Sequence, residues 1–169
     1  MPDLGGVVFN DYSADVLNKF HDAVLRALER CGEQAEGYAK DLAPVDTGLL
    51  RNSITHAISG EAPAVKSYRA DNPKPGRKNS GSYSGTAPKE EGGLSVYIGT
   101  NVEYAPYVEL GTGKNTEGGR PTSWGYTDDE GNAHWTAGNP AQPYLAPAVK
   151  DHVQTYRNIL EDEFKNGGH

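Results

Sequence analysis

The longest run of regular apolar spacing in this sequence lies near the N-terminus and predicts one long amphipathic helix. Ser13 is a suitable N-cap, and Pro44 disfavours helical geometry in the residue before it, so the helix should cover about 29 residues. Its length would be roughly 43 Å. A helix this long with a narrow apolar stripe needs either a sheet beneath it or a neighbouring subunit beside it. The stripe consists of Leu17, Phe20, Val24, Leu28, Cys31, Ala35, Tyr38 and Leu42.

A second amphipathic helix is predicted near the C-terminus, where apolar residues recur at the same spacing from Val149 to Phe164. Between the two helices, alternating apolar and polar residues predict one strand over residues 54–59 and a returning strand over 94–98. We therefore expect an α+β fold, in which a long N-terminal helix and a C-terminal helix pack on a small antiparallel sheet with long loops.

The length of 169 residues suits a single domain, 1–169, with three segments outside its regular elements. Residues 1–12 are expected to form an N-terminal arm. Residues 61–93 are expected to form a flexible basic excursion, and residues 114–140 a glycine-rich loop that carries an aromatic hairpin. No apolar run approaches the roughly 18 residues that a membrane span needs, so we expect no membrane partner.

The basic excursion stands out against the acidic character of the whole chain. The formal net charge is -7, yet residues 64–89 carry six basic side chains and one acidic side chain. Because apolar residues are few here, we expect this segment not to pack on its own domain but to order on a partner. Its candidate contact residues are Lys66, Tyr68, Arg69, Arg77, Lys78 and Tyr83.

The aromatic hairpin is predicted over residues 123–136, where two short aromatic segments flank an acidic turn that ends in Gly131. Trp124 and Trp135 lie in these segments. An exposed ribbon with two tryptophans is either folded over the body or kept for a partner. We count both tryptophans as candidate partner contacts.

A search for catalytic, cofactor and metal sites yields no assignment. The five histidines show no metal-ligand spacing, and Cys31, the single cysteine, lies in the apolar stripe. Glu109 is the one carboxylate that attracts attention. It is expected to form a helix cap or an ion pair with Arg51, and its alternative role is catalysis together with His134.

Three segments in this order resemble a known family: APVDTGLLRNSI at 43–54, VYIGTNVEYAPYVELGTG at 96–113 and AQPYLAPAV at 141–149. The chain resembles the neck, or tail-completion, proteins of tailed bacteriophages, which form a head–tail joining family of tail components. The resemblance implies a non-enzymatic structural protein without a cofactor. Its motif residues correspond here to Pro44, Asp46, Thr47, Gly48, Leu50, Ser53, Gly99, Tyr104, Glu109, Gly111, Thr112, Pro143, Leu145 and Pro147.

These motif residues are interpreted as architectural. Gly48 and Gly111 would permit turns that a Cβ atom would strain. Tyr104 and Leu145 would be core anchors, and Glu109 would fix the turn that follows it.

The resemblance also implies partners and a location. The partners would be phage neck and tail proteins, namely the connector or stopper, the tail terminator and the tail tube. A homo-oligomeric ring of six copies is preferred and twelve is the alternative, with DNA only as passing cargo. The location would be the virion, after assembly in the host cytoplasm. Two other hypotheses remain: a nucleic-acid-binding module acting through residues 64–89, and a small hydrolase using Glu109 and His134.

Overall fold

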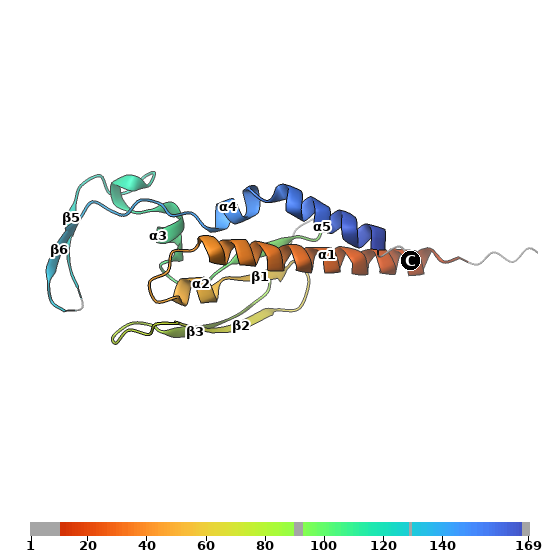
Figure 1. The fold of residues 1–169 in the computed structure, drawn as a ribbon, viewed down its shortest axis with the longest axis horizontal. Helices are drawn as coiled ribbons and strands as arrows, with labels where there is room; N and C mark the ends of the chain where they lie inside the picture. Colours follow the sequence, from red (N-terminus) through yellow and green to blue (C-terminus); the bar gives the residue numbers. More distant parts are fainter. Residues whose placement is uncertain (1–10, 90–92, 129, 167–169) are drawn as a thin grey trace, which may run out of the picture.

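The computed structural model describes residues 11–89, 93–128 and 130–166. The molecule is elongated, and helix α1 (Ser13–Leu42) runs along its long axis (Figure 1). The N-terminal end of α1 projects beyond the rest of the described structure at one end of the molecule. The 30-residue helix confirms the prediction of one long N-terminal helix.

Helix α1 is the middle layer of the body. Two helices, α4 (Leu145–Lys150) and α5 (Val153–Asn166), pack along one side of it. On the other side α1 contacts strands β1 (Thr55–Ile58) and β4 (Val96–Gly99), which pair antiparallel as expected. The architecture is α+β, as predicted.

The remaining elements are short and lie around this body. Two further antiparallel pairs extend outward, one beside α2 and one at the end opposite the N-terminus of α1 (Figure 1). The elements are α2 (Leu49–Ser53), β2 (Ala64–Arg69), β3 (Ser80–Gly85), α3 (Ala105–Leu110), the 3-10 turn η1 (Gly113–Asn115), β5 (Trp124–Thr127) and β6 (Ala133–Thr136).

The face that α1 buries is made of small residues rather than of the whole predicted stripe. Leu17 and Phe20, in its first turns, are 67% and 58% exposed. Small side chains let elements pack closely on both sides of a helix, whereas the first turns of α1 project beyond most of the elements that cover the rest of it. The buried residues of α1 are Ala23, Ala27, Cys31, Gly32, Ala35 and Ala39.

The C-terminal helix is two helices separated by a turn at Asp151 and His152. The stacked rings of Tyr38 and His152 join this turn to α1, with centroids 3.5 Å apart. Phe20 and Phe164 stack in the same way farther along, at 5.4 Å. These contacts hold the C-terminal segment along α1.

The core lies where α1, α2 and the start of α4 meet, and its largest fully buried side chain is that of Tyr144. The prediction that Tyr104 is a core anchor is wrong, because this side chain is 43% exposed. Tyr104 is the N-cap residue of α3, and the next residue, Ala105, faces the core instead. Leu145 is partly buried and packs against the core edge.

The prediction that residues 64–89 do not pack on their own domain is also wrong. Strands β2 and β3 pair over six residues, and β2 packs against α2. Tyr68, expected to face a partner, is only 5% exposed and belongs to the core. The ladder pairs the backbone groups that β2 and β3 turn toward each other, and Tyr68 together with a few polar ties holds the hairpin on the body.

Candidate assembly site

The motif carboxylate Glu109 joins α3 to α4. Its two oxygens accept hydrogen bonds from the backbone N–H groups of Tyr144, Leu145 and Ala146, at 2.8, 3.0 and 2.9 Å. These amides form the N-terminal end of α4, where the helix dipole favours a negative charge. Glu109 is therefore a helix cap supplied from a distant segment. The structure thus supports the cap, although the capped helix is α4 and not the turn after Glu109.

The residues that follow Glu109 hold the segment that leads back from the aromatic ribbon. The N–H of Thr112 donates to the carbonyl of Asn139 at 2.9 Å, and the N–H of Asn139 donates to the Thr112 hydroxyl at the same distance. Gly111 has φ +77°, and a Cβ there would lie 2.8 Å from the backbone nitrogen of Ala141. The motif glycine therefore permits both the turn and the close approach of two chain segments.

The motif segment at residues 46–48 ties the β2–β3 hairpin to the body. The carbonyl of Thr47 accepts N–H groups from Asp71 and Asn72 at 2.8 and 3.1 Å. Gly48 has φ +82°, and a Cβ on it would lie 2.0 Å from Asp71 Oδ2. Asp71 also accepts a hydrogen bond at 2.7 Å from Arg51, which was the expected partner of Glu109. The expected ion pair between Glu109 and Arg51 is therefore not formed.

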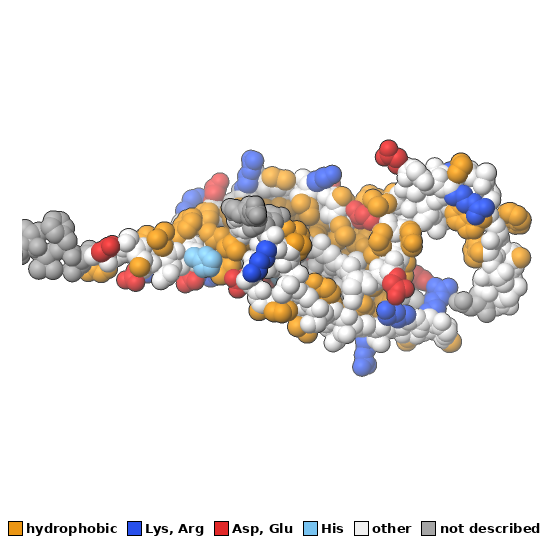
Figure 2. All heavy atoms as spheres, turned by 180° about the vertical axis from the view of Figure 1, so that it is seen from behind, with side chains coloured by type: hydrophobic (Ala, Val, Ile, Leu, Met, Phe, Trp, Pro, Cys, Tyr) orange, Lys and Arg blue, Asp and Glu red, His pale blue; other side chains and the backbone are white. Residues whose placement is uncertain are grey.

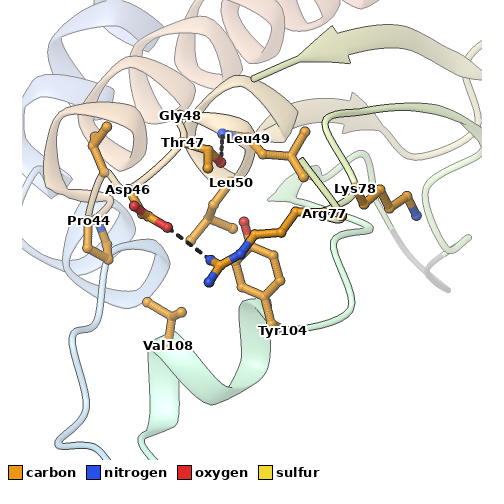
Figure 3. Close-up of a pocket in the computed structure, with 12 residues that line it drawn as sticks. Pro44, Asp46, Thr47, Gly48, Leu49, Leu50, Arg77, Lys78, Tyr104 and Val108 are labelled. Carbon is orange, nitrogen blue, oxygen red and sulfur yellow. Dashed lines mark hydrogen bonds and ion pairs between the residues drawn. The ribbon is translucent and has the colours of Figure 1, made fainter. Parts of the chain in front are cut away.

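Motif residues also line a cavity of about 590 Å³ between the end of α1, α2, α3 and the loop after β2 (Figure 3). Leu50 and Val108 provide apolar surface, and the ring of Tyr104 stands at the side of the cavity. Arg77 reaches across toward Asp46, and its guanidinium Nη1 lies 3.3 Å from the carboxylate. Lys74 also pairs with Asp46, and this ammonium group is the main cause of a lowered pKa of that carboxyl group.

A polar cluster lies on the opposite side of α1 from α5, at the strands. Glu36 accepts from His56 Nδ1 at 2.8 Å and from Lys66 Nζ at 2.7 Å, and it also pairs with Lys40. Burial disfavours the charged carboxylate, but these three donors together lower the pKa of Glu36 well below its usual range. The bond to Glu36 is the main cause of a raised pKa of His56. Lys66, a predicted partner contact, thus binds Glu36 of its own chain.

The aromatic ribbon formed by β5 and β6 projects from the end of the molecule opposite the N-terminus of α1 (Figure 1). Trp135 is 79% exposed and Tyr126 is 51% exposed. Trp124 is half-buried, and the guanidinium of Arg120 lies 5.7 Å from its ring centroid. The predicted hairpin is confirmed, and its exposed aromatic surface is available for contact.

The other predicted contact residues differ in their surroundings. Arg69 and Lys78 are exposed, Arg77 is exposed with its ion pair to Asp46, and Tyr83 is half-buried on β3. The basic charge of the hairpin is therefore offset in part by Glu36 and Asp46. This pairing weakens the hypothesis that residues 64–89 act as a nucleic-acid-binding module.

The two residues of the hydrolase hypothesis serve separate structures. Glu109 is occupied by three backbone amides, while His134 bonds to Asp128 at 2.7 Å within the ribbon. Within the described ranges, no group of three or more His, Cys, Asp or Glu side chains is arranged to hold a metal ion. No helix among the described residues has the length and apolarity to cross a membrane.

Sequence reasoning missed three polar residues that organise the site: Glu36, Asn52 and Asp71. Asn52 donates to the Arg69 carbonyl and to Asp71, both at 2.8 Å. Asp71 is the only acidic residue in the basic segment 64–89, and this isolated position in the sequence could have indicated its structural role. The sequence gives no such signal for the bonds that Glu36 forms with His56 and Lys66, because these two partners come from distant strands.

When the chain is compared with known protein families, one family model matches it. The model of the family described as "Bacteriophage HK97-gp10, putative tail-component" matches residues 9–111. This range includes α1, the β2–β3 hairpin, Glu109 and all of the cavity-lining segments. No curated protein and no solved structure matches the chain.

Proposed function

Because this chain belongs to the bacteriophage HK97-gp10-like family of tail components, we propose that it is a structural protein of the head–tail junction. In this role it forms or binds a ring that joins the tail to the head. Six copies are the preferred number and twelve the alternative. The proposed partners are the connector or stopper, the tail terminator and the tail tube, with DNA as passing cargo.

The observation that carries this proposal is that the motif residues form hydrogen bonds between separate segments of the chain. Glu109, Gly111 and Thr112 join α3, α4 and the base of the aromatic ribbon through backbone hydrogen bonds. Groups committed in this way hold surfaces in position, and the Glu109 carboxylate is already engaged by three backbone amides. This arrangement and the family support a structural role, and we propose that the chain has no catalytic centre and needs no cofactor.

The ribbon supports a contact with other junction proteins. Large exposed aromatic side chains are enriched at protein interfaces, and Trp135 is held on a paired strand away from the body. The proposed location is the virion neck or tail, with assembly in the host cytoplasm.

Inactivating the gene in a phage or prophage that carries it tests this function. We expect full heads and separate tails to accumulate, and a plasmid copy to restore joined particles. A Trp135→Ala copy should restore few joined particles, whereas Val65→Ala, at another strongly exposed side chain (74%), should restore them fully. Normal particle yield without the gene would contradict the proposal.

A further inference from the structure

We propose that the projecting end of α1 in one copy binds the motif cavity of a neighbouring copy, head to tail. The helix tip is Asp11, Tyr12, Asp15, Val16 and Leu17; the motif pocket is the cavity at Val45, Asp46, Leu50, Arg77, Tyr104 and Val108. This inference rests on the proposed function for its partner, a second copy of the chain. It adds the two surfaces and their pairing.

The helix tip is an apolar surface without a cover in the described structure. Tyr12, Val16 and Leu17 are 62%, 61% and 67% exposed. Tyr12 and Val16 are four residues apart and lie on one face, with Leu17 beside it. Figure 2 shows hydrophobic and acidic side chains interspersed along this projecting end. Exposed apolar residues gathered at one place are typical of an interaction surface.

The motif pocket has the shape and chemistry to receive such a tip. Its volume is about 590 Å³. Leu50 is buried at the pocket, whereas the side chains of Val45 and Tyr104 remain 52% and 43% exposed. Tyr104 lies at the pocket side as a large ring that stays partly exposed (Figure 3). A helix tip inserted here would cover apolar surface on both partners.

The charges of the two surfaces are complementary. The first ten residues of the described chain, 11–20, carry Asp11 and Asp15 against Lys19. The pocket side carries Lys74, Arg77 and Lys78 against Asp46. An acidic tip is therefore matched with a net basic pocket, which favours this orientation over tip against tip.

The positions of the surfaces require two copies. The tip begins α1 and the pocket lies just beyond the other end of α1, so about 45 Å of helix separates them. No copy can fill its own pocket while α1 is continuous. A contact between different surfaces of identical chains is heterologous, and it closes into a ring or continues as a filament. Every copy in such a ring would donate one tip and receive one.

Three variants of the full chain test the contact by analytical ultracentrifugation. Leu17→Asp places a charge on the tip, and Val45→Asp places one at the pocket beside an incoming acidic tip. Val153→Asp is the matched control, because this valine is 46% exposed on α5, outside both surfaces. Circular dichroism and thermal melting establish that each variant is folded.

We expect the wild-type chain to self-associate with rising concentration and the control to do the same. Leu17→Asp and Val45→Asp should each weaken association by about tenfold or more, the effect of losing one central interface residue. Mixed in equal amounts, they should form a dimer and nothing larger. The intact tip of one variant fits the intact pocket of the other, but the pair has no second usable contact.

Three results would overturn the inference. One is a wild-type chain that stays monomeric up to about 1 mM. The second is loss of association with Leu17→Asp but not with Val45→Asp, which indicates tip-to-tip pairing. The third is a mixture that forms no dimer. If the monomeric wild type still restores joined particles, the pocket faces a different tail protein and the proposed function survives alone.

Discussion

At the scale of single residues, this protein uses its carboxylates as ties between distant segments. Glu109 joins α3 to α4, Glu36 joins α1 to β1 and β2, and Asp71 joins the hairpin to α2. Each accepts bonds from more than one donor, and apart from Lys40 beside Glu36 these donors lie far away in the sequence. A carboxylate that looks catalytic in the sequence can therefore be fully engaged in structure.

Replacing Glu109 with alanine should lower the free energy of unfolding by about 2–3 kcal/mol. The reason is that three backbone amides at the start of α4 lose a charged acceptor. Chemical denaturation with a circular dichroism signal measures this change. Glu103→Ala, an exposed carboxylate in the same segment, is the control and should change the value by less than about 0.5 kcal/mol. Equal effects of the two substitutions would refute the capping role.

Tyr144 should tolerate loss of its hydroxyl group but not of its ring. The side chain is fully buried, and its hydroxyl has no hydrogen-bond partner in the described structure. We expect Tyr144→Ala to cost about 3–5 kcal/mol and Tyr144→Phe to be neutral or stabilising by about 1 kcal/mol. Tyr104→Ala, at an exposed ring, should cost less than about 1 kcal/mol. Denaturant titration of the three variants ranks them, and a larger loss at Tyr104 would contradict this core assignment.

The His56 cluster should make stability depend on pH in a defined direction. The hydrogen bond to Glu36 raises the pKa of folded His56 above its ordinary value of 6.5. Protonated His56 therefore stabilises the fold fully below pH 6.5, and this contribution is lost as pH rises through the folded pKa. The stability difference between wild type and His56→Gln should shrink as pH is raised from 6 toward 8. A difference that grows over this range would contradict the sign.

At the scale of elements, the β2–β3 hairpin is the feature that sequence reasoning placed wrongly. Its composition is polar and basic, which is typical of a solvated loop. Its stability on the body comes from cross-strand backbone pairing, from Tyr68 in the core and from the ties at Thr47 and Asp71. Cross-strand pairs such as Ala64 with Gly85, and the tie between Thr47 and Asp71, join residues that are far apart in the sequence, so a local pattern does not contain them.

Other elements were predictable because their signals are local. The spacing of apolar residues specified α1, the alternation at residues 54–59 and 94–98 specified β1 and β4, and the acidic turn specified the β5–β6 ribbon. Glu109 was correctly suspected as a cap, but the helix that it caps lies 35 residues away. Which side of α1 is covered, and which end projects, depends on the three-dimensional arrangement alone.

Gly48 and Gly60 form a matched pair for testing the hairpin attachment. Both have positive φ, at +82° and +80°, but only Gly48 faces Asp71, while Gly60 has open space around it. Alanine at Gly60 should cost about 1 kcal/mol from backbone strain alone. Alanine at Gly48 should cost at least about 1 kcal/mol more, since it also displaces Asp71. Thermal melting measures both, with faster proteolysis between β2 and β3 as a second readout for Gly48→Ala.

If the two glycine variants melt alike, the hairpin is not held at Gly48. Asp71→Asn then provides an independent check, because it keeps the shape of the side chain and removes the charge that pairs with Arg51. In a chain that also carries Asp71→Asn, Gly48→Ala should lower the melting temperature by at least as much as it does in the wild-type chain.

At the scale of the whole molecule, the body presents different surfaces at its two ends. The apolar tip of α1 projects at one end, and the aromatic ribbon and the motif pocket lie toward the other (Figure 1). Such polarity suits the proposed contacts, in which neighbouring copies join head to tail and other tail proteins bind through the ribbon.

The central claim is that the protein is a repeated component of the junction between head and tail. Cryo-electron microscopy of joined particles from a phage that carries this gene tests it most directly. The account predicts a closed ring of this chain at the junction, with six copies or the alternative of twelve, α1 tips directed at neighbouring copies and ribbons directed at another ring. Density for the chain as a single copy, or no density for it at the junction, would contradict the account.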